Sequence, residues 1–105
     1  MSFEAVLITS KNMDSLIQNK VLSCFEASEL FLVIERRISH EQSSCTYSYI
    51  ETNRENRPED FYVILEQLEV YLCFYSATTE QQNRITHLLA ECLHRVGIQG
   101  EFEEP

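Results

Sequence analysis

The residue types best suited to chemistry gather near the end of the chain, where His87, Glu91 and His94 are spaced four and three residues apart. On a helix this spacing places all three side chains on one face. Two histidines one turn apart can bind zinc, but these two are seven residues apart, roughly 10 Å along a helix axis. Arg84 and Arg95 flank them and would repel a cation. We therefore expect a solvated helix face and no metal site.

The sequence contains neither a recognisable catalytic nucleophile nor a phosphate-binding loop. No serine lies in a Gly-x-Ser-x-Gly elbow. Both glycines, Gly97 and Gly100, come after residue 96, whereas P-loop and dinucleotide-binding folds need glycines where the backbone approaches a ligand. We predict that the protein is not an enzyme and needs no cofactor.

The four cysteines fit a structural role better than a chemical one. Cys24, Cys45, Cys73 and Cys92 form no Cys-x-x-Cys pair, and each falls on the apolar phase of its predicted element. Small buried thiols of this kind are common in reducing compartments. We expect four reduced cysteines in the core.

Acidic residues are in large excess. The chain has 17 Asp and Glu against 8 Lys and Arg, a formal net charge of -9, of which -7 falls in residues 55–105. The chain is also 44% apolar and patterned like a folded domain, so the excess does not indicate a disordered tail. A compact domain with one strongly acidic half is expected to meet a basic partner.

Other partners and compartments are disfavoured. The only adjacent basic pair, Arg36-Arg37, lies inside a predicted strand, so direct binding to nucleic acid is not expected. The first apolar run, residues 5–8, is too short for a signal peptide, and no stretch approaches the roughly 20 apolar residues of a membrane span. We expect a cytosolic protein that does not bind membranes.

Periodicity predicts the elements of the first half of the chain. Apolar residues at helical spacing after Asn12, a potential cap, indicate a helix that ends near Ala27. The strands are expected at residues 3–9, at 30–38 as a central strand, and at 45–50, with a hairpin link through 39–44.

The second half begins with an ambiguous segment. Phe61, Ile64, Leu65 and Leu68 fit helical spacing after Pro58, which predicts a short helix over residues 59–67. A strand that runs on into the next strand is the alternative.

The remaining elements are clearer. A strand is predicted over residues 70–77, and Thr79-x-x-Gln82 matches the capping box of a long amphipathic helix. Gly97 is placed to end that helix, and residues 98–103 can form a final strand.

These elements predict one α+β domain over residues 1–105. The order is β-α-β-β-(short α)-β-α-β, and two helices with one apolar stripe each must cover one face of a sheet. We therefore expect a two-layer sandwich with a mostly antiparallel, four- to five-stranded sheet and two main helices on one face. Apart from the short helix and the last strand, this order resembles a ferredoxin-like fold.

Candidate contacts for a basic partner combine tyrosines with carboxylates, because tyrosines anchor interfaces and carboxylates steer a basic protein. The proposed anchors are Tyr47, Tyr49 and Tyr62, with packing of Tyr47 and Tyr49 inside the sheet as the alternative. The proposed contact carboxylates are Glu51, Glu55, Glu59, Asp60, Glu101, Glu103 and Glu104.

Four features of the chain carry a family resemblance: its size, its acidity, the amphipathic helix Gln81 to Val96 and the ending Gly-Ile-Gln-Gly-Glu-Phe-Glu-Glu. In these features the chain resembles the immunity proteins of bacterial polymorphic toxins, including those of contact-dependent growth-inhibition systems. The resemblance implies a protein that binds a basic toxin domain, often a nuclease, and occludes its active site. No family motif assigns roles to residues. Two alternatives stay open: a phage-type inhibitor that mimics nucleic acid, and a small ligand-binding regulatory domain. The sequence does not indicate an oligomeric state.

Overall fold

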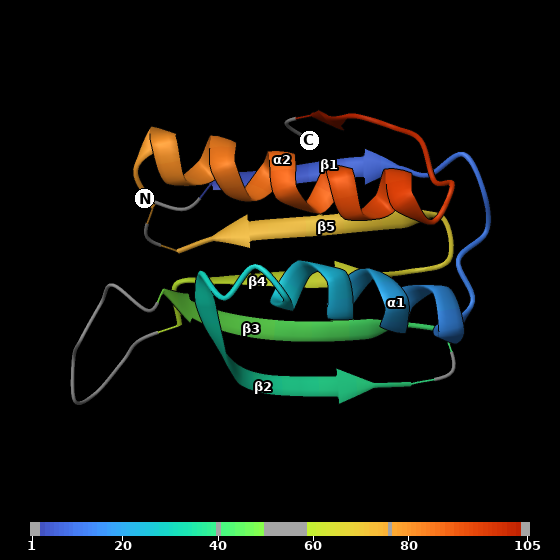
Figure 1. Cartoon of the computed structure of the whole chain (residues 1–105), viewed down its shortest axis with the longest axis horizontal. Coiled ribbons are helices and arrows are strands. Elements are labelled where there is room, and N and C mark those ends of the chain that lie inside the picture. The colour runs from blue at the N-terminus through green and yellow to red at the C-terminus, as the bar shows by residue number, and fades with distance from the viewer. Residues whose placement is uncertain (1–2, 40, 50–58, 76, 104–105) are drawn as a thin grey trace.

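The computed structural model describes residues 3–39, 41–49, 59–75 and 77–103 of the 105-residue chain. These residues form an α+β fold with one sheet and two helices (Figure 1). In chain order the elements are β1 (Phe3–Ile8), α1 (Ser15–Glu26), β2 (Phe31–Ile38), β3 (Ser43–Tyr49), β4 (Phe61–Leu65), β5 (Glu69–Phe74), α2 (Thr79–Arg95) and β6 (Phe102–Glu103).

The six strands form a single antiparallel sheet in the order β2-β3-β4-β5-β1-β6. Hairpins join β2 to β3 and β4 to β5, since the Ser39 N–H donates to the Gln42 carbonyl at 2.8 Å and the Glu66 N–H donates to the Glu69 carbonyl at 2.8 Å. Strands β1 and β6 come from the two ends of the chain and pair with each other, with Leu7 opposite Phe102.

Both helices pack on the same face of the sheet (Figure 1). The core lies between the two layers and is rich in aromatic rings. Phe61 is central to it, with ring centroids 5.2 Å from Tyr47, 5.4 Å from Phe31 and 5.6 Å from Phe74. Phe25 of α1 completes the group, at 4.5 Å from Phe31. The rings that Phe25 contacts belong to β2, β3 and β4, so α1 covers that half of the sheet.

The helix ends follow ordinary capping chemistry. The Asp14 side chain accepts a hydrogen bond from the Ile17 N–H at 2.9 Å, so α1 begins two residues later than a cap at Asn12 would place it. Thr78 and Gln81 form the capping box of α2, one residue before the pair expected from the sequence. Gly97 adopts φ +81° just past α2, in the left-handed region where glycine is favoured.

The predicted helix over residues 59–67 is wrong, and the strand alternative is confirmed. Phe61, Val63 and Leu65 are fully buried, while Tyr62 and Ile64 between them are only half-buried. This is the period-two pattern of a strand. The segment is also rich in aromatic and β-branched residues, which favour strands.

Strand β2 is an edge strand, although its continuous apolar run predicted a central one. It pairs with β3 alone among the described strands, and only Phe31 is buried. The sheet is therefore one strand wider than the predicted maximum of five. The two-layer α+β class is as expected, and neither described helix is long and apolar enough to cross a membrane.

Candidate interaction surface

The sheet face opposite the helices, called here the open face, is covered by no described helix. Side chains alternate along each strand, so the neighbours of the core residues point to this face. The strand residues on it are Glu4, Val6, Ile8, Leu32, Glu35, Arg37, Ser44, Thr46, Ser48, Tyr62, Ile64, Glu69, Tyr71, Cys73 and Glu103. The face thus combines tyrosines, aliphatic side chains and carboxylates.

Two tyrosines meet on this face. Tyr62 on β4 lies opposite Cys73 on β5, and its ring lies 5.5 Å from that of Tyr75, tilted by 47°. Such diagonal neighbours on adjacent antiparallel strands are within reach of aromatic side chains. Tyr75 is exposed, so the pair presents a ring surface with polar tips to solvent.

Two carboxylates lie beside this pair. Contact with the Cys73 thiol, partial burial, and the charges of Tyr75 and Glu4 raise the pKa of Tyr62 to about 12. Partial burial, Cys73 and Glu59 likewise raise the pKa of Tyr75. The strand pairing agrees with this, because Glu4 and Tyr62 both lie opposite Cys73. Glu59 precedes Asp60, whose carbonyl accepts from the Tyr75 N–H. We call Tyr62, Tyr75, Glu4 and Glu59 the acidic tyrosine patch.

The charge of the open face is strongly negative. The described strands contribute Glu4, Glu35, Glu69 and Glu103 to it, against the single base Arg37. Arg37 bonds Glu35 of its own strand at 3.0 Å. None of the ion pairs among the described residues involves the other three carboxylates.

Two of the three predicted tyrosine anchors are in the core. Tyr47 is fully buried, and its hydroxyl donates to Glu26 Oε2 at 2.9 Å. Tyr49 is also buried, against Phe61 at 5.5 Å. Burial is the main reason that the pKa of each tyrosine is raised. Neither ring is available to a partner, so the alternative of packing inside the sheet is the correct one.

Asp60 is buried as well, although the sequence suggested a contact carboxylate. One of its oxygens accepts hydrogen bonds from the Tyr49 N–H at 2.7 Å and from Ser48 Oγ at 3.1 Å. Its backbone N–H donates to the Tyr47 carbonyl, and its carbonyl accepts from the Tyr75 N–H. This residue ties β3, β4 and β5 together.

The other predicted contacts divide into two groups. Tyr62 and Glu103 lie on the open face, and Glu59 and Glu101 are exposed. Glu51, Glu55 and Glu104 lie outside the described residues. Phe102, between Glu101 and Glu103, packs against the core as a strand end predicts.

Sequence reasoning missed Glu4, Glu69 and Tyr75. A usable signal was present, because the alternation Tyr71-Leu72-Cys73-Phe74-Tyr75 places the two tyrosines on the face opposite Leu72 and Phe74. The predicted strand over residues 70–77 was correct in type, but its phase was not used. The position of Glu4 on this face could not be predicted, because it depends on the long-range pairing of β1 with β5, which no local pattern specifies.

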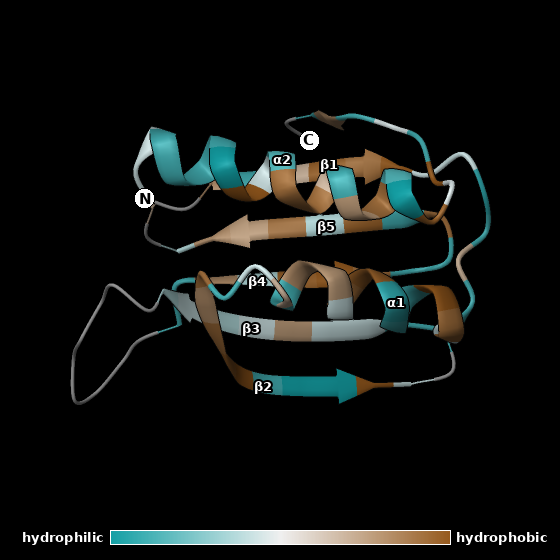
Figure 2. Cartoon of the chain, viewed as in Figure 1, coloured by the Kyte–Doolittle hydropathy of each residue, from teal (hydrophilic) through white to brown (hydrophobic). Residues whose placement is uncertain are grey.

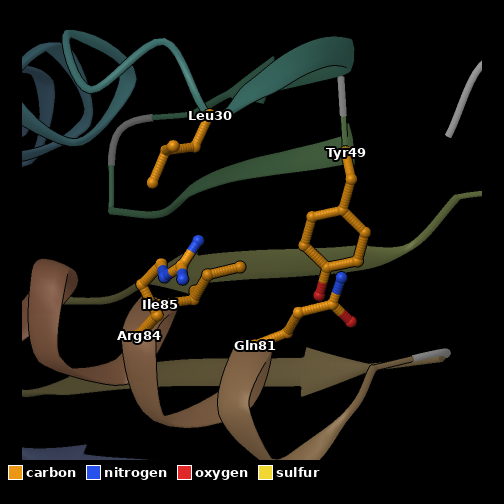
Figure 3. A pocket seen from close by; sticks show the side chains of 5 residues that line it. All are labelled: Leu30, Tyr49, Gln81, Arg84 and Ile85. Atoms are coloured by element: carbon orange, nitrogen blue, oxygen red, sulfur yellow. The ribbon is translucent and has the colours of Figure 1, made fainter. Parts of the chain in front are cut away.

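One small cavity lies on the helix side of the described structure. A cavity of about 30 Å³ lies between the start of β2, the end of β3 and α2, where Tyr49 points toward Gln81 (Figure 3). Its lining residues are Leu30, Tyr49, Gln81, Arg84 and Ile85. This volume suits a water molecule and is well below the roughly 300–1,000 Å³ of small-molecule sites.

The cysteines match the expected core placement only in part, because Cys45 and Cys92 belong to the core whereas Cys24 is half-buried and Cys73 points to the open face. All four cysteines are free, and Cys45, Cys73 and Cys92 are buried. Burial and the neighbouring Cys24 raise the pKa of Cys92 to about 12, which keeps this thiol protonated. His87 and His94 are exposed on α2, and no group of three potential ligands in the described part of the chain could hold a metal ion.

No family model, curated protein or solved structure matches this chain. The function must therefore be argued from the geometry of the open face.

Proposed function

We propose that the protein is a cytosolic, non-enzymatic binding protein that neutralises a basic toxin domain by covering its active site. A nuclease is the expected class of toxin, because a nuclease must present a basic groove to phosphates. The acidic tyrosine patch, on an open face with three unbalanced strand carboxylates, is the observation that supports this proposal.

The chemistry of the patch suits Lys and Arg side chains. A cation within about 6 Å of a tyrosine ring is attracted by the ring's quadrupole, and the neighbouring carboxylates of Glu4 and Glu59 add a charge-assisted bond. Together these groups can replace the phosphates that a nuclease contacts. Val6, Ile64 and Tyr71 on the same face supply apolar area.

The contact set is revised from the one predicted from the sequence. It keeps Tyr62, Glu59, Glu101 and Glu103, together with Glu51, Glu55 and Glu104, which lie outside the described residues. It gains Glu4, Glu69 and Tyr75, which lie on or beside the same face. Buried Tyr47, Tyr49 and Asp60 leave the set and serve the fold.

The direct test is binding to the small basic domain encoded by the gene immediately upstream. We expect that domain to be captured from solution and its toxicity to be suppressed on co-expression. Association should slow markedly between about 50 and 500 mM salt, because steering between opposite charges is screened. An association rate that is constant over this range would contradict the electrostatic part of the proposal.

Variants of the patch separate charge from anchoring. Glu4→Gln with Glu59→Gln should slow association at low salt, whereas Tyr75→Ala should raise the dissociation rate at least about tenfold. Glu80→Gln with Glu91→Gln is the matched control for charge, since it also removes two charges, from exposed positions of α2 in the other layer. An equal effect of the control variant would show that only net charge matters.

A further inference from the structure

Strand β2 leaves one long edge of the sheet without a described neighbour. Seven of its eight residues are exposed, and neither helix lies over it (Figure 1). The exposed fractions include 45% for Leu32, 44% for Val33, 44% for Ile34 and 57% for Ile38. A long apolar edge with free backbone donors and acceptors is a template for another strand.

Five residues of this edge, 34–38, follow a symmetric order. Apolar Leu32-Val33-Ile34 precedes the charged Glu35-Arg36-Arg37, and apolar Ile38 follows, as the colours of β2 in Figure 2 show. A strand with this order matches a second strand of the same sequence that runs in the opposite direction. Charged positions then face charged positions, and position 34 faces position 38.

We propose that a second copy of this chain pairs antiparallel with β2 about a two-fold axis at Arg36, which extends the sheet across a dimer. Glu35 of each copy then lies opposite Arg37 of the other copy, twice by symmetry. Both residues point to the open face, since they are in register with Thr46 and Ser44 of β3. Opposite charges at directly paired positions stabilise antiparallel strands.

The centre of this pairing is compatible with the charges around it. Arg36 meets its own copy, but each Arg36 guanidinium is bonded to both carboxylate oxygens of Glu26 in its own chain. The register irregularity in β2 lies between Val33 and Glu35, so the pairs of Glu35 with Arg37 fall in the regular segment that follows it.

A basic partner fits this edge poorly. Arg36 is paired with Glu26 and Arg37 with Glu35, so the edge has no unbalanced carboxylate to attract such a partner. The other edge of the sheet is the two-residue β6, too short to pair in the same way. The β2 edge is thus separate from the acidic tyrosine patch, and the dimer does not depend on the proposed toxin partner.

The test measures the association of the purified protein alone by sedimentation from about 1 to about 200 µM, because a dimer must respond to concentration. We expect a monomer–dimer equilibrium. Glu35→Arg places like charges opposite each other and should raise the dimer dissociation constant at least about tenfold. The double variant Glu35→Arg/Arg37→Glu restores opposite charges in the same pairing and should recover the dimer.

The substituted side chains are exposed and their own ion pair contributes little to stability, so the variants should fold and melt like the wild type. A wild-type protein that stays monomeric over the whole range overturns the proposal. A dimer that Glu35→Arg leaves unchanged, or that the double variant fails to recover, also overturns it.

Discussion

Asp60 shows how a residue that looks like a surface contact serves the fold instead. Its carboxylate accepts from the Tyr49 N–H and from Ser48 Oγ, and its backbone joins β3 to β5. Burial of a carboxylate is tolerated only where donors surround it. Position 60 therefore carries structure, while its exposed neighbour Glu59 remains available to a partner.

The prediction at this scale is a contrast between these two neighbours. Asp60→Asn keeps the size of the side chain but replaces charge-assisted bonds with neutral ones, which should lower the free energy of unfolding by about 1–3 kcal/mol. Glu59→Gln should change it by less than about 0.5 kcal/mol. Urea denaturation measures both, and similar small changes for the two variants would show that the Asp60 carboxylate contributes no such bonds.

At the scale of elements, the sequence pattern predicted those features that interactions between nearby residues determine. The stripe of α2, its stop at Gly97, and the alternation of β3 were readable because capping and burial act within a few residues. Residues 61–65 were not, since Phe61, Ile64 and Leu65 fit a helix while Phe61, Val63 and Leu65 fit a strand. Pairing with β3 and β5 on either side decided between them.

The prediction that β2 is a central strand was wrong for a related reason. Leu30 to Ile34 is as apolar as a central strand, but position in a sheet is set by which strands pair, and β3 is its only described neighbour. An apolar run predicts that its strand is buried against other elements. Here the chain's own described elements leave it exposed, which is why its sequence bears on association with a second copy.

The start of α2 offers a test of element boundaries. Thr78 Oγ1 accepts from the Gln81 N–H at 3.1 Å, and Gln81 Oε1 accepts from the Thr78 N–H at 2.9 Å. Thr78→Ala removes this cap and should lower the free energy of unfolding by about 1 kcal/mol. Thr79→Ala, inside the first turn, should cost less than about 0.5 kcal/mol because alanine favours helices. Thermal unfolding of both variants distinguishes them, and a larger loss for Thr79→Ala would place the cap at Thr79.

At the scale of the whole molecule, the two faces of the sheet divide the tyrosines between two tasks. Tyr47 and Tyr49 fill the core under the helices, while Tyr62, Tyr71 and Tyr75 lie on the opposite side. The net charge of -9 is likewise uneven across the layers, because the open face has unbalanced carboxylates. The tyrosines that fill the core are therefore distinct from those of the proposed contact surface.

The same division predicts how the whole protein responds to alkali. A tyrosine in the unfolded chain has a pKa near 10. In the folded protein the pKa of Tyr47 and of Tyr49 is raised, mainly by burial. The pKa of Tyr62 is raised to about 12, mainly by contact with Cys73. Between these values the unfolded chain loses protons that the folded chain keeps. By linkage, the stability is fully present below pH 10 and falls as the pH rises through the folded pKa values.

The chain has five tyrosines and no tryptophan, so tyrosinate absorbance reports this directly. In the folded protein, Tyr47, Tyr49 and Tyr62 should remain protonated after the urea-unfolded chain has titrated. Tyr62→Phe should make the fall in stability between about pH 10 and 12 less steep, while the stability at neutral pH changes little, since linkage removes only this residue's proton difference. Titration of all five tyrosines near pH 10 in the folded state would contradict the placement of Tyr47 and Tyr49 in the core.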